Sequence, residues 1–282
     1  MPQTINTNLN SLNAQRNLNT SQMSLSVSMQ RLSSGLRVNS AKDDAAGLAI
    51  AERMNAQVKG MNVAARNAND GISLAQTAEG ALGKVSDALQ RMRELTVQSR
   101  NASNSSSDKD SLNKEFKQLS MEIVRVLGAT TFNGKDILAS GAGALDFQIG
   151  ANTTTNDLIT ISTANMLTNA SITAVTGNTV SIGSDANTTA LKNVIDSIDG
   201  ALDKINSERA VYGATQSRFD AIISNLQVAA ENQTAARSRI MDADFAVETA
   251  NLSRAQILQQ AGNAMVAQAN QLPQNVLKLL GG

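Results

Sequence analysis

The chain has 282 residues, and its 24 basic and 24 acidic side chains give a formal net charge of zero. It contains no histidine and no cysteine, which excludes histidine-activated nucleophiles, disulfides and the usual zinc sites. The balanced charge disfavours nucleic-acid binding, and the absence of any run of about 18 apolar residues argues against membrane insertion. We therefore expect a protein that is not an enzyme and uses no cofactor or metal.

The first predicted element is a helical arm over residues 1–40. It carries three arginines and no acidic side chain, which resembles an amphipathic transit peptide, but it lacks the apolar stretch of a cleavable secretory signal. The two prolines of the chain are Pro2 and Pro273, so no proline interrupts the helices between them. An apolar stripe at helical spacing marks the face expected to pair in a coiled coil or an assembly: Leu25, Met29, Leu32 and Leu36.

Residues 41–128 are predicted to form the first half of a helical bundle. Ser40 and Asp43 make a variant of the capping box, and Asp44 adds a negative charge that the helix dipole favours, so a long helix is expected over residues 41–99. After a polar turn, a second helix doubles back. Both helices carry apolar stripes in steps of three and four, which are typical of helices packed on partner helices: Leu82, Val85, Leu89 and Met92, then Leu112, Phe116, Leu119, Ile123 and Val126.

The composition changes over residues 129–190, where Thr, Asn, Gly, Ser and Ala dominate and charged side chains are sparse. Short alternating runs at residues 158–161 and 180–182 predict strands. A flexible polar insert is the alternative interpretation of such a composition. We favour a small β-rich region that includes a small variable outer part.

Helical periodicity returns over residues 191–240, the predicted second half of the bundle. Residues 241–282 are predicted to form a second arm, whose stretch from residue 255 onward carries one charged side chain, Lys278, and whose stripe ends at Pro273. Such weakly charged arms cannot bury enough surface alone to offset chain entropy, so they should order only against each other and neighbouring copies. The stripe residues expected in the coiled coil or assembly are Leu258, Ala261 and Met265.

The expected fold is mainly α, a long antiparallel helical bundle and coiled coil built from both chain ends, with a small β-rich central insert. Two carboxylate pairs within it could suggest chemistry. Asp43 and Asp44 are adjacent on a helix and point about 100° apart, so a capping role is favoured over a catalytic one. Asp244 and Glu248 share a helical face, but two carboxylates are too few for a calcium site, so we expect a solvated or interfacial polar pair.

Several sequence blocks match a known family in the correct order. Together they strongly resemble bacterial flagellin, the subunit of the flagellar filament, over roughly residues 1–140 and 190–282. The blocks are RLSSGLRVNSAKDDAAGLAIAERM at 31–54, RNANDGISLAQTAEGAL at 66–82, LQRMRELTVQS at 89–99, TFNGKDIL at 131–138, SRIMDADFAVETANLSRAQIL at 238–258 and QANQLPQNVLKLL at 268–280.

This resemblance implies a structural subunit that polymerises into a hollow filament for swimming motility. In flagellins the two chain ends pair as a coiled coil that lines the inner tube, a helical bundle surrounds it, and the middle of the chain faces outward. The family leaves the cell unfolded through the flagellar type III export channel and becomes extracellular. The implied partners are other copies of the chain, an export chaperone, the filament cap, and hook–filament junction proteins.

The resemblance also implies a binding surface for the flagellin-sensing toll-like receptor of the host. The matching positions are Arg91, Leu95 and Glu115, with Gln90 beside them. Because Gln90, Arg91 and Leu95 lie off the apolar stripe of their helix, we expect them to approach the bundle surface.

Two other functions remain open at this point. A hook–filament junction protein has related terminal helices, although the full block at 66–82 favours the filament subunit. A secreted effector or pore-forming translocator belongs to a different class and would need a long apolar segment for membrane insertion, which this sequence lacks.

Overall fold

The computed structural model describes residues 7–280, and their side chains as far as residue 271. It is mainly helical, with two small antiparallel hairpins in the centre of the chain, which confirms the predicted fold class. The elements in order are α1 (Leu9–Ser34), α2 (Ala45–Ser99), α3 (Ser106–Ala129), β1 (Thr131–Phe132), β2 (Lys135–Asp136), β3 (Ala144–Gln148), the 3-10 helix η1 (Thr155–Asp157), β4 (Leu158–Ser162), α4 (Ala170–Thr176), α5 (Thr188–Met241) and α6 (Phe245–Leu280).

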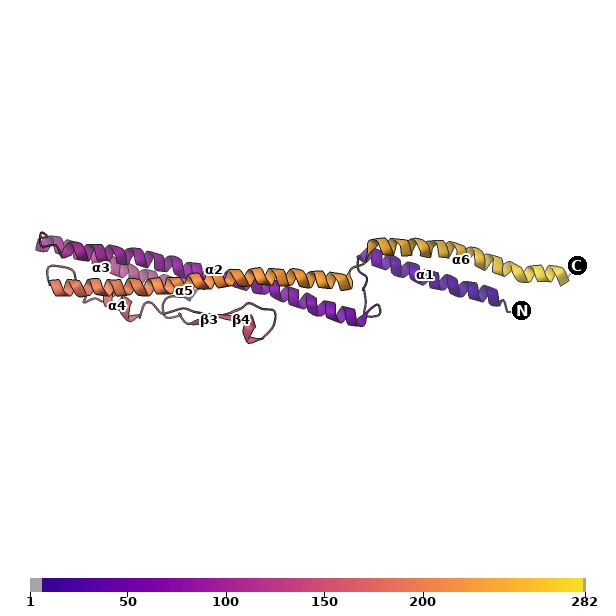
Figure 1. Cartoon of the computed structure of the whole chain (residues 1–282), viewed down its shortest axis with the longest axis horizontal. Helices are drawn as coiled ribbons and strands as arrows, with labels where there is room; N and C mark the ends of the chain where they lie inside the picture. Colours follow the sequence, from indigo (N-terminus) through magenta and orange to yellow (C-terminus); the bar gives the residue numbers. More distant parts are fainter. Residues whose placement is uncertain (1–6, 281–282) are drawn as a thin grey trace. The chain divides into compact units, whose positions relative to one another are not determined.

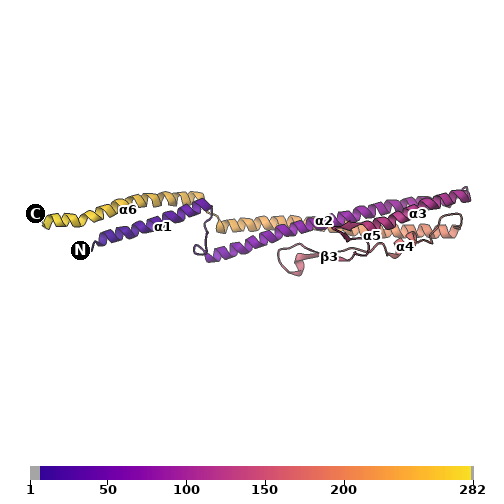
Figure 2. The same cartoon turned by 180° about the vertical axis from the view of Figure 1, so that it is seen from behind.

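The chain forms two compact units. One contains the residues up to Ala56 and from Asn232 onward, and the other contains Gln57–Glu231. In the first unit α1 lies alongside α6, as seen from both sides of the molecule (Figures 1 and 2). In the second unit α2, α3 and α5 share one core, which α4 and the β3–β4 hairpin also contact. The long helices α2 and α5 each contribute residues to both units.

The start of α2 differs from its prediction, because the adjacent Asp43 and Asp44 bond to different backbone groups. The carboxylate of Asp43 accepts the backbone N–H groups of Asn39 (3.1 Å) and Ser40 (2.9 Å) and so closes a turn before the helix. The bond from Ser40, followed by that from Asn39, lowers the pKa of Asp43. Asp44 accepts the N–H of Gly47 at 2.7 Å and caps the helix. The helix therefore begins at Ala45 rather than near residue 41.

The end of α6 also differs from its prediction. The stripe was expected to end at Pro273, but the helical backbone continues to Leu280. A proline removes one N–H group, and the good helix formers that follow it allow the helix to continue.

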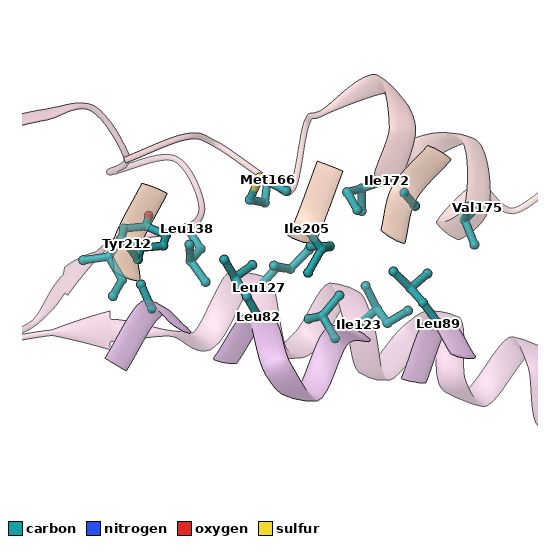
Figure 3. Close-up of a cluster of buried hydrophobic side chains, with 14 of the residues drawn as sticks. Leu82, Leu89, Ile123, Leu127, Leu138, Met166, Ile172, Val175, Ile205 and Tyr212 are labelled. Atoms are coloured by element: carbon teal, nitrogen blue, oxygen red, sulfur yellow. The ribbon is translucent and has the colours of Figure 1, made fainter. Parts of the chain in front are cut away.

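Large apolar side chains from three helices fill the core of the second unit (Figure 3). This arrangement confirms that the three predicted stripes satisfy one another in a bundle. The side chains labelled in Figure 3 are Leu82 and Leu89 from α2, Ile123 and Leu127 from α3, Ile205 and Tyr212 from α5, Leu138, and Met166, Ile172 and Val175 from the segment around α4.

The central insert contains one of the two predicted strands. Residues 158–161 lie in β4, which pairs with β3 in an antiparallel register that places Phe147 opposite Ile159. The strand expected at residues 180–182 is wrong, because this segment is irregular. Its backbone groups bond to helix side chains instead: the N–H of Ile182 donates to Oδ1 of Asn113 (3.0 Å), and Oγ of Ser99 donates to the carbonyl of Ile182 (2.5 Å). These polar side chains replace a neighbouring strand.

An aromatic contact joins the hairpin to the bundle. Phe219 of α5 is fully buried and meets Phe147 of β3 edge to face, with ring centroids 5.8 Å apart and planes at 76°. Gly71 of α2 makes room for this ring, because a Cβ atom at that position would lie 2.7 Å from Cζ of Phe219. The Phe219 ring therefore packs here only because residue 71 is a glycine and has no side chain.

Tyr212 is the largest fully buried side chain of the bundle, and its hydroxyl has no hydrogen-bond partner among the residues that the structure describes. An unpaired buried hydroxyl costs free energy that phenylalanine would not. We expect Tyr212→Phe to leave the free energy of unfolding unchanged or to raise it by about 1 kcal/mol, measured by urea unfolding followed by circular dichroism. A loss of about 2 kcal/mol or more would instead indicate a bound partner for the hydroxyl.

The same substitution should change the response of the protein to alkali. Burial raises the pKa of Tyr212 to about 12, followed in size by the charge of Glu208, whereas an unfolded tyrosine has a pKa of about 10. Above the lower value the unfolded state loses its proton first, so wild-type stability falls as the pH rises from about 10 to 12. Tyr212→Phe should lose less stability across this window. Equal losses in the two proteins would contradict the expectation.

Candidate assembly interface

The two terminal helices form an antiparallel coiled coil. At one end the side-chain amide of Asn8 donates to the carbonyl of Ala269 (2.7 Å), and at the other Arg31 lies 3.8 Å from Glu248. The buried or half-buried positions of both helices follow alternating steps of three and four, the heptad spacing of a coiled-coil seam. These seam positions are Ser11, Ala14, Leu18, Ser21, Leu25, Ser28 and Leu32 in α1, and Glu248, Leu252, Ala255, Gln259, Gly262, Val266 and Ala269 in α6; Arg31 and Asn251 beside them are also half-buried.

This seam is built mostly from small and polar side chains. The most buried positions of α1 are Ser11 and Ser28, and those of α6 include Ala255 and Ala269. At Gly262 the helices approach closely, because a Cβ atom there would lie 3.0 Å from Cδ1 of Leu18. Such a seam removes less apolar surface from water than a seam of large apolar side chains would.

Many of the larger apolar side chains of the same helices lie outside the seam. Each is at least 40% exposed, which reverses the usual arrangement of a coiled coil in water. An apolar surface of this kind marks an interaction site. Its members are Leu9, Leu12, Met23, Val27 and Met29 in α1, and Phe245, Val247, Ile257, Leu258 and Met265 in α6.

One flank of the helix pair is hollowed into a groove of about 610 Å³. Met23 and Val27 of α1 and Leu258 of α6 supply its apolar lining, and Arg31 and Arg254 lie among its polar residues. We call this feature the arm groove. It gives the exposed apolar surface a concave shape that another helix could fill.

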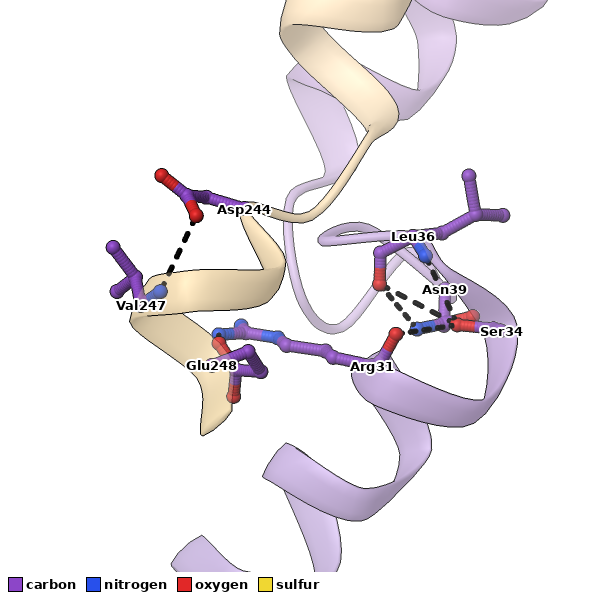
Figure 4. A network of polar contacts seen from close by, with 7 residues as sticks. All are labelled: Arg31, Ser34, Leu36, Asn39, Asp244, Val247 and Glu248. Atoms are coloured by element: carbon purple, nitrogen blue, oxygen red, sulfur yellow. Dashed lines mark hydrogen bonds and ion pairs between the residues drawn. The ribbon is translucent and has the colours of Figure 1, made fainter. Parts of the chain in front are cut away.

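The polar residues where α1 ends and α6 begins have separate roles (Figure 4). Asp244 accepts the N–H groups of Ala246 (2.9 Å) and Val247 (3.2 Å) and so caps α6. Glu248 is 6% exposed and forms its ion pair with Arg31. The two carboxylates were predicted to be either a solvated or an interfacial polar pair. Asp244 lies at the surface, whereas Glu248 lies in the seam.

The predicted stripe residues of the arms fall into two groups. Leu25 and Leu32 are half-buried in the seam, and Leu36 is half-buried in a β-bridge with Asp242. The others are exposed, and among them Leu258 lines the arm groove; they are Met29, Leu258, Ala261 and Met265. Sequence reasoning missed the serines, alanines and glycine of the seam, which only their heptad spacing could have revealed.

The residues expected at a receptor surface lie on the bundle. Gln90 and Arg91 are exposed, and the guanidinium of Arg91 donates to Glu115 (2.9 Å) and Glu94 (3.0 Å). The bond to Glu115, followed by that to Glu94, raises the pKa of Arg91. These contacts hold the guanidinium of Arg91 between α2 and α3.

Leu95 departs from the expectation, because it is fully buried. In this part of α2 the buried positions are wider than a two-position stripe, since the helix packs against both α3 and α5. They are Leu82, Val85, Ser86, Leu89, Met92, Leu95, Thr96 and Ser99.

Two other classes of site have no support among the residues that the structure describes. Within residues 7–280 no three or more acidic side chains gather in a way that could hold a metal ion. None of the helices in that part of the chain is both long and apolar enough to cross a bilayer.

Comparison with known proteins gives matches to both ends of the chain. The family model for the bacterial flagellin N-terminal helical region matches residues 5–142, and that for the C-terminal helical region matches residues 195–280. A flagellin of Halalkalibacterium halodurans is 45% identical over 98% of this chain and 99% of its own length, and one of Xenorhabdus nematophila is 45% identical over 99% and 100%. A crystal structure of Bacillus cereus flagellin has 31% identity and a TM-score of 0.49, covering 57% of this chain and 88% of that one.

Proposed function

This chain belongs to the bacterial flagellin family, as its sequence blocks suggested, and we propose that it is a structural subunit that polymerises into the flagellar filament. The observation that carries the proposal is the distribution of side chains in the arm. Its seam is mostly small and polar, while many of its large apolar residues are exposed, and Met23, Val27 and Leu258 among them line the arm groove. An assembly of copies buries these residues, whereas an isolated chain leaves them in water.

Contacts between different surfaces of identical subunits extend without closing, and they build helical fibres. Permanent interfaces of this kind bury about 2,000–5,000 Å² and are apolar. In our proposal the arms of residues 1–40 and 241–282 supply this interface, the segments 41–128 and 191–240 form the surrounding bundle, and residues 129–190 face outward. The subunit has no catalytic role.

The wider setting of the proposal follows the family. The chain leaves the cell unfolded through the flagellar type III export channel and acts outside the cell in swimming motility. Its partners are an export chaperone, the filament cap, the hook–filament junction proteins and other copies of itself. The small and polar side chains that make up most of the arm seam support export in an unfolded state, because such arms gain little stability before assembly.

Seeded polymerisation tests the proposal. Purified chain is mixed with short fragments of its own filaments and imaged by electron microscopy, and pelleted protein is measured over time. Long filaments are expected. Chains that remain monomeric with seeds and with a salt precipitant would contradict the proposal and would favour a hook–filament junction protein or a secreted effector.

We further infer that the bundle binds the flagellin-sensing toll-like receptor. The observation in favour is the exposed Arg91, whose guanidinium is fixed by two carboxylates. Gln90 and Glu115 flank it, whereas the buried Leu95 supports the helix from inside. An arginine held in one orientation loses little entropy on binding, which favours it as an interface anchor.

Arg91→Ala should lower receptor activation by about tenfold or more in a reporter-cell assay, as expected for an interface hot spot. Arg125→Ala is a matched control, because Arg125 is also an exposed arginine of the bundle paired with a nearby glutamate, Glu122. It should retain the parent activity. Equal activity of the two variants would contradict the assignment of Arg91.

A further inference from the structure

The apolar pattern of the arm seam does not define a single register. Leu18, Leu25 and Leu32 of α1 repeat every seven residues, and small residues of α6 do the same at Ala255, Gly262 and Ala269. Leu18 lies against Gly262, and the same spacing sets Leu25 opposite Ala255. A slip of one heptad that sets Leu18 opposite Ala269 would place each of the three leucines opposite a small residue, so packing alone does not penalise it.

The polar contacts of the arm do distinguish these registers. Where the start of α1 lies against residues 269 and 270 of α6, the side-chain amide of Asn8 donates to the carbonyl of Ala269. Beside it, Oγ of Ser11 donates to Oδ1 of Asn270 at 2.6 Å. The strongest discrimination comes from the other end, where Glu248 is almost completely buried opposite Arg31. In the slip that sets Leu18 opposite Ala269, Arg31 would move by seven residues, about 10 Å along the helix axis, and Glu248 would lose its cation.

We propose that Arg31 and Glu248 select the register of the arm pair and exclude the one-heptad slip. A buried carboxylate that loses its cation is strongly destabilising, whereas the intact pair adds little net stability. The ion pair therefore selects one register over another rather than adding stability, as a single buried polar residue does in other coiled coils. The backbone bonds between Arg37 and Met241 (2.6 Å) and between Ala243 and Gly35 (3.0 Å) hold the same register where the two helices are joined.

The register of the arm pair can be measured by disulfide cross-linking, because the chain has no cysteine of its own and introduced cysteines are the only ones present. The Cβ built at Gly262 lies 3.6 Å from Cβ of Leu18, which fits a disulfide. Leu18→Cys with Gly262→Cys therefore reports the native register, and Leu18→Cys with Ala269→Cys reports the slipped one. Each pair is oxidised in the parent, in Arg31→Glu, and in the charge exchange Arg31→Glu with Glu248→Arg, both as monomer and after seeding.

In the parent, the native pair should cross-link at least about tenfold more than the slipped pair. Arg31→Glu should lower this ratio by about tenfold, because it sets two carboxylates against each other, and the charge exchange should restore it. An unchanged ratio in Arg31→Glu would overturn the proposal, as would the absence of cross-links in every protein and condition. A ratio that changes as expected in chains that fail to form filaments would contradict the proposed function and leave the register assignment standing.

Discussion

Val27→Asp combined with Leu258→Asp is expected to abolish filament growth while leaving the helical bundle folded. Both side chains line the arm groove and are 40% and 50% exposed, so the monomer tolerates the change. Assembly would bury two carboxylates without partners, which costs several kcal/mol for each charge. Growth should fall below detection in seeded polymerisation, measured by electron microscopy and by pelleting.

A matched variant separates loss of apolar contact from general disturbance of the arm. Val27→Ile combined with Leu258→Met keeps both positions apolar and close in volume, so growth should continue. Circular dichroism of all three proteins should give the same helical content from the bundle. Parent-like growth of the aspartate variant would show that the arm groove stays open in the filament.

Phe219→Ala should lower the free energy of unfolding of the bundle by about 3–5 kcal/mol. The ring is fully buried, meets Phe147 edge to face and lies over Gly71, so its removal leaves a cavity that neither neighbour can fill. Urea unfolding followed by circular dichroism measures the loss. The β3–β4 hairpin should loosen at the same time, because Phe147 loses its aromatic partner.

Phe245→Ala is the control for this prediction. Phe245 is 56% exposed at the start of α6, so the same change of residue should alter stability by less than about 0.5 kcal/mol. Comparable losses at the two positions would contradict the packing described around Phe219.

The bundle could be predicted from the sequence because its buried positions carry large apolar residues. Leu82 and Leu89 in α2, like Phe116 and Ile123 in α3, lie seven residues apart, and each is buried where that spacing places it. Leu95 could not be placed in the same way, because a two-position stripe underestimates a helix that packs against two neighbours. The irregular segment at residues 180–182 alternates as a strand would, but its hydrogen-bond partners are side chains far away in the sequence.

The arms show a different limit of sequence reasoning. A hydrophobic stripe selects the largest apolar residues, and in α6 these include Leu258 and Met265, which are exposed. Several of the positions that contact α1 are small or charged, such as Gly262 and Glu248. Periodicity therefore indicated that the arms pair, but it could not separate the seam from the outward surface. That separation required knowing which helix face lies against the partner.

The burial of Tyr212 has a spectroscopic consequence. The chain has no tryptophan and this single tyrosine, so all intrinsic tyrosine emission comes from the unit of residues 57–231. The arm contributes no tyrosine emission, although its helices contribute to the far-ultraviolet dichroism. Fluorescence will therefore report melting of the bundle core alone, and a dichroism change without a fluorescence change will isolate a change in helices outside that core. Tyrosine fluorescence and far-ultraviolet dichroism together can therefore follow the bundle core and the other helices separately, without an added label.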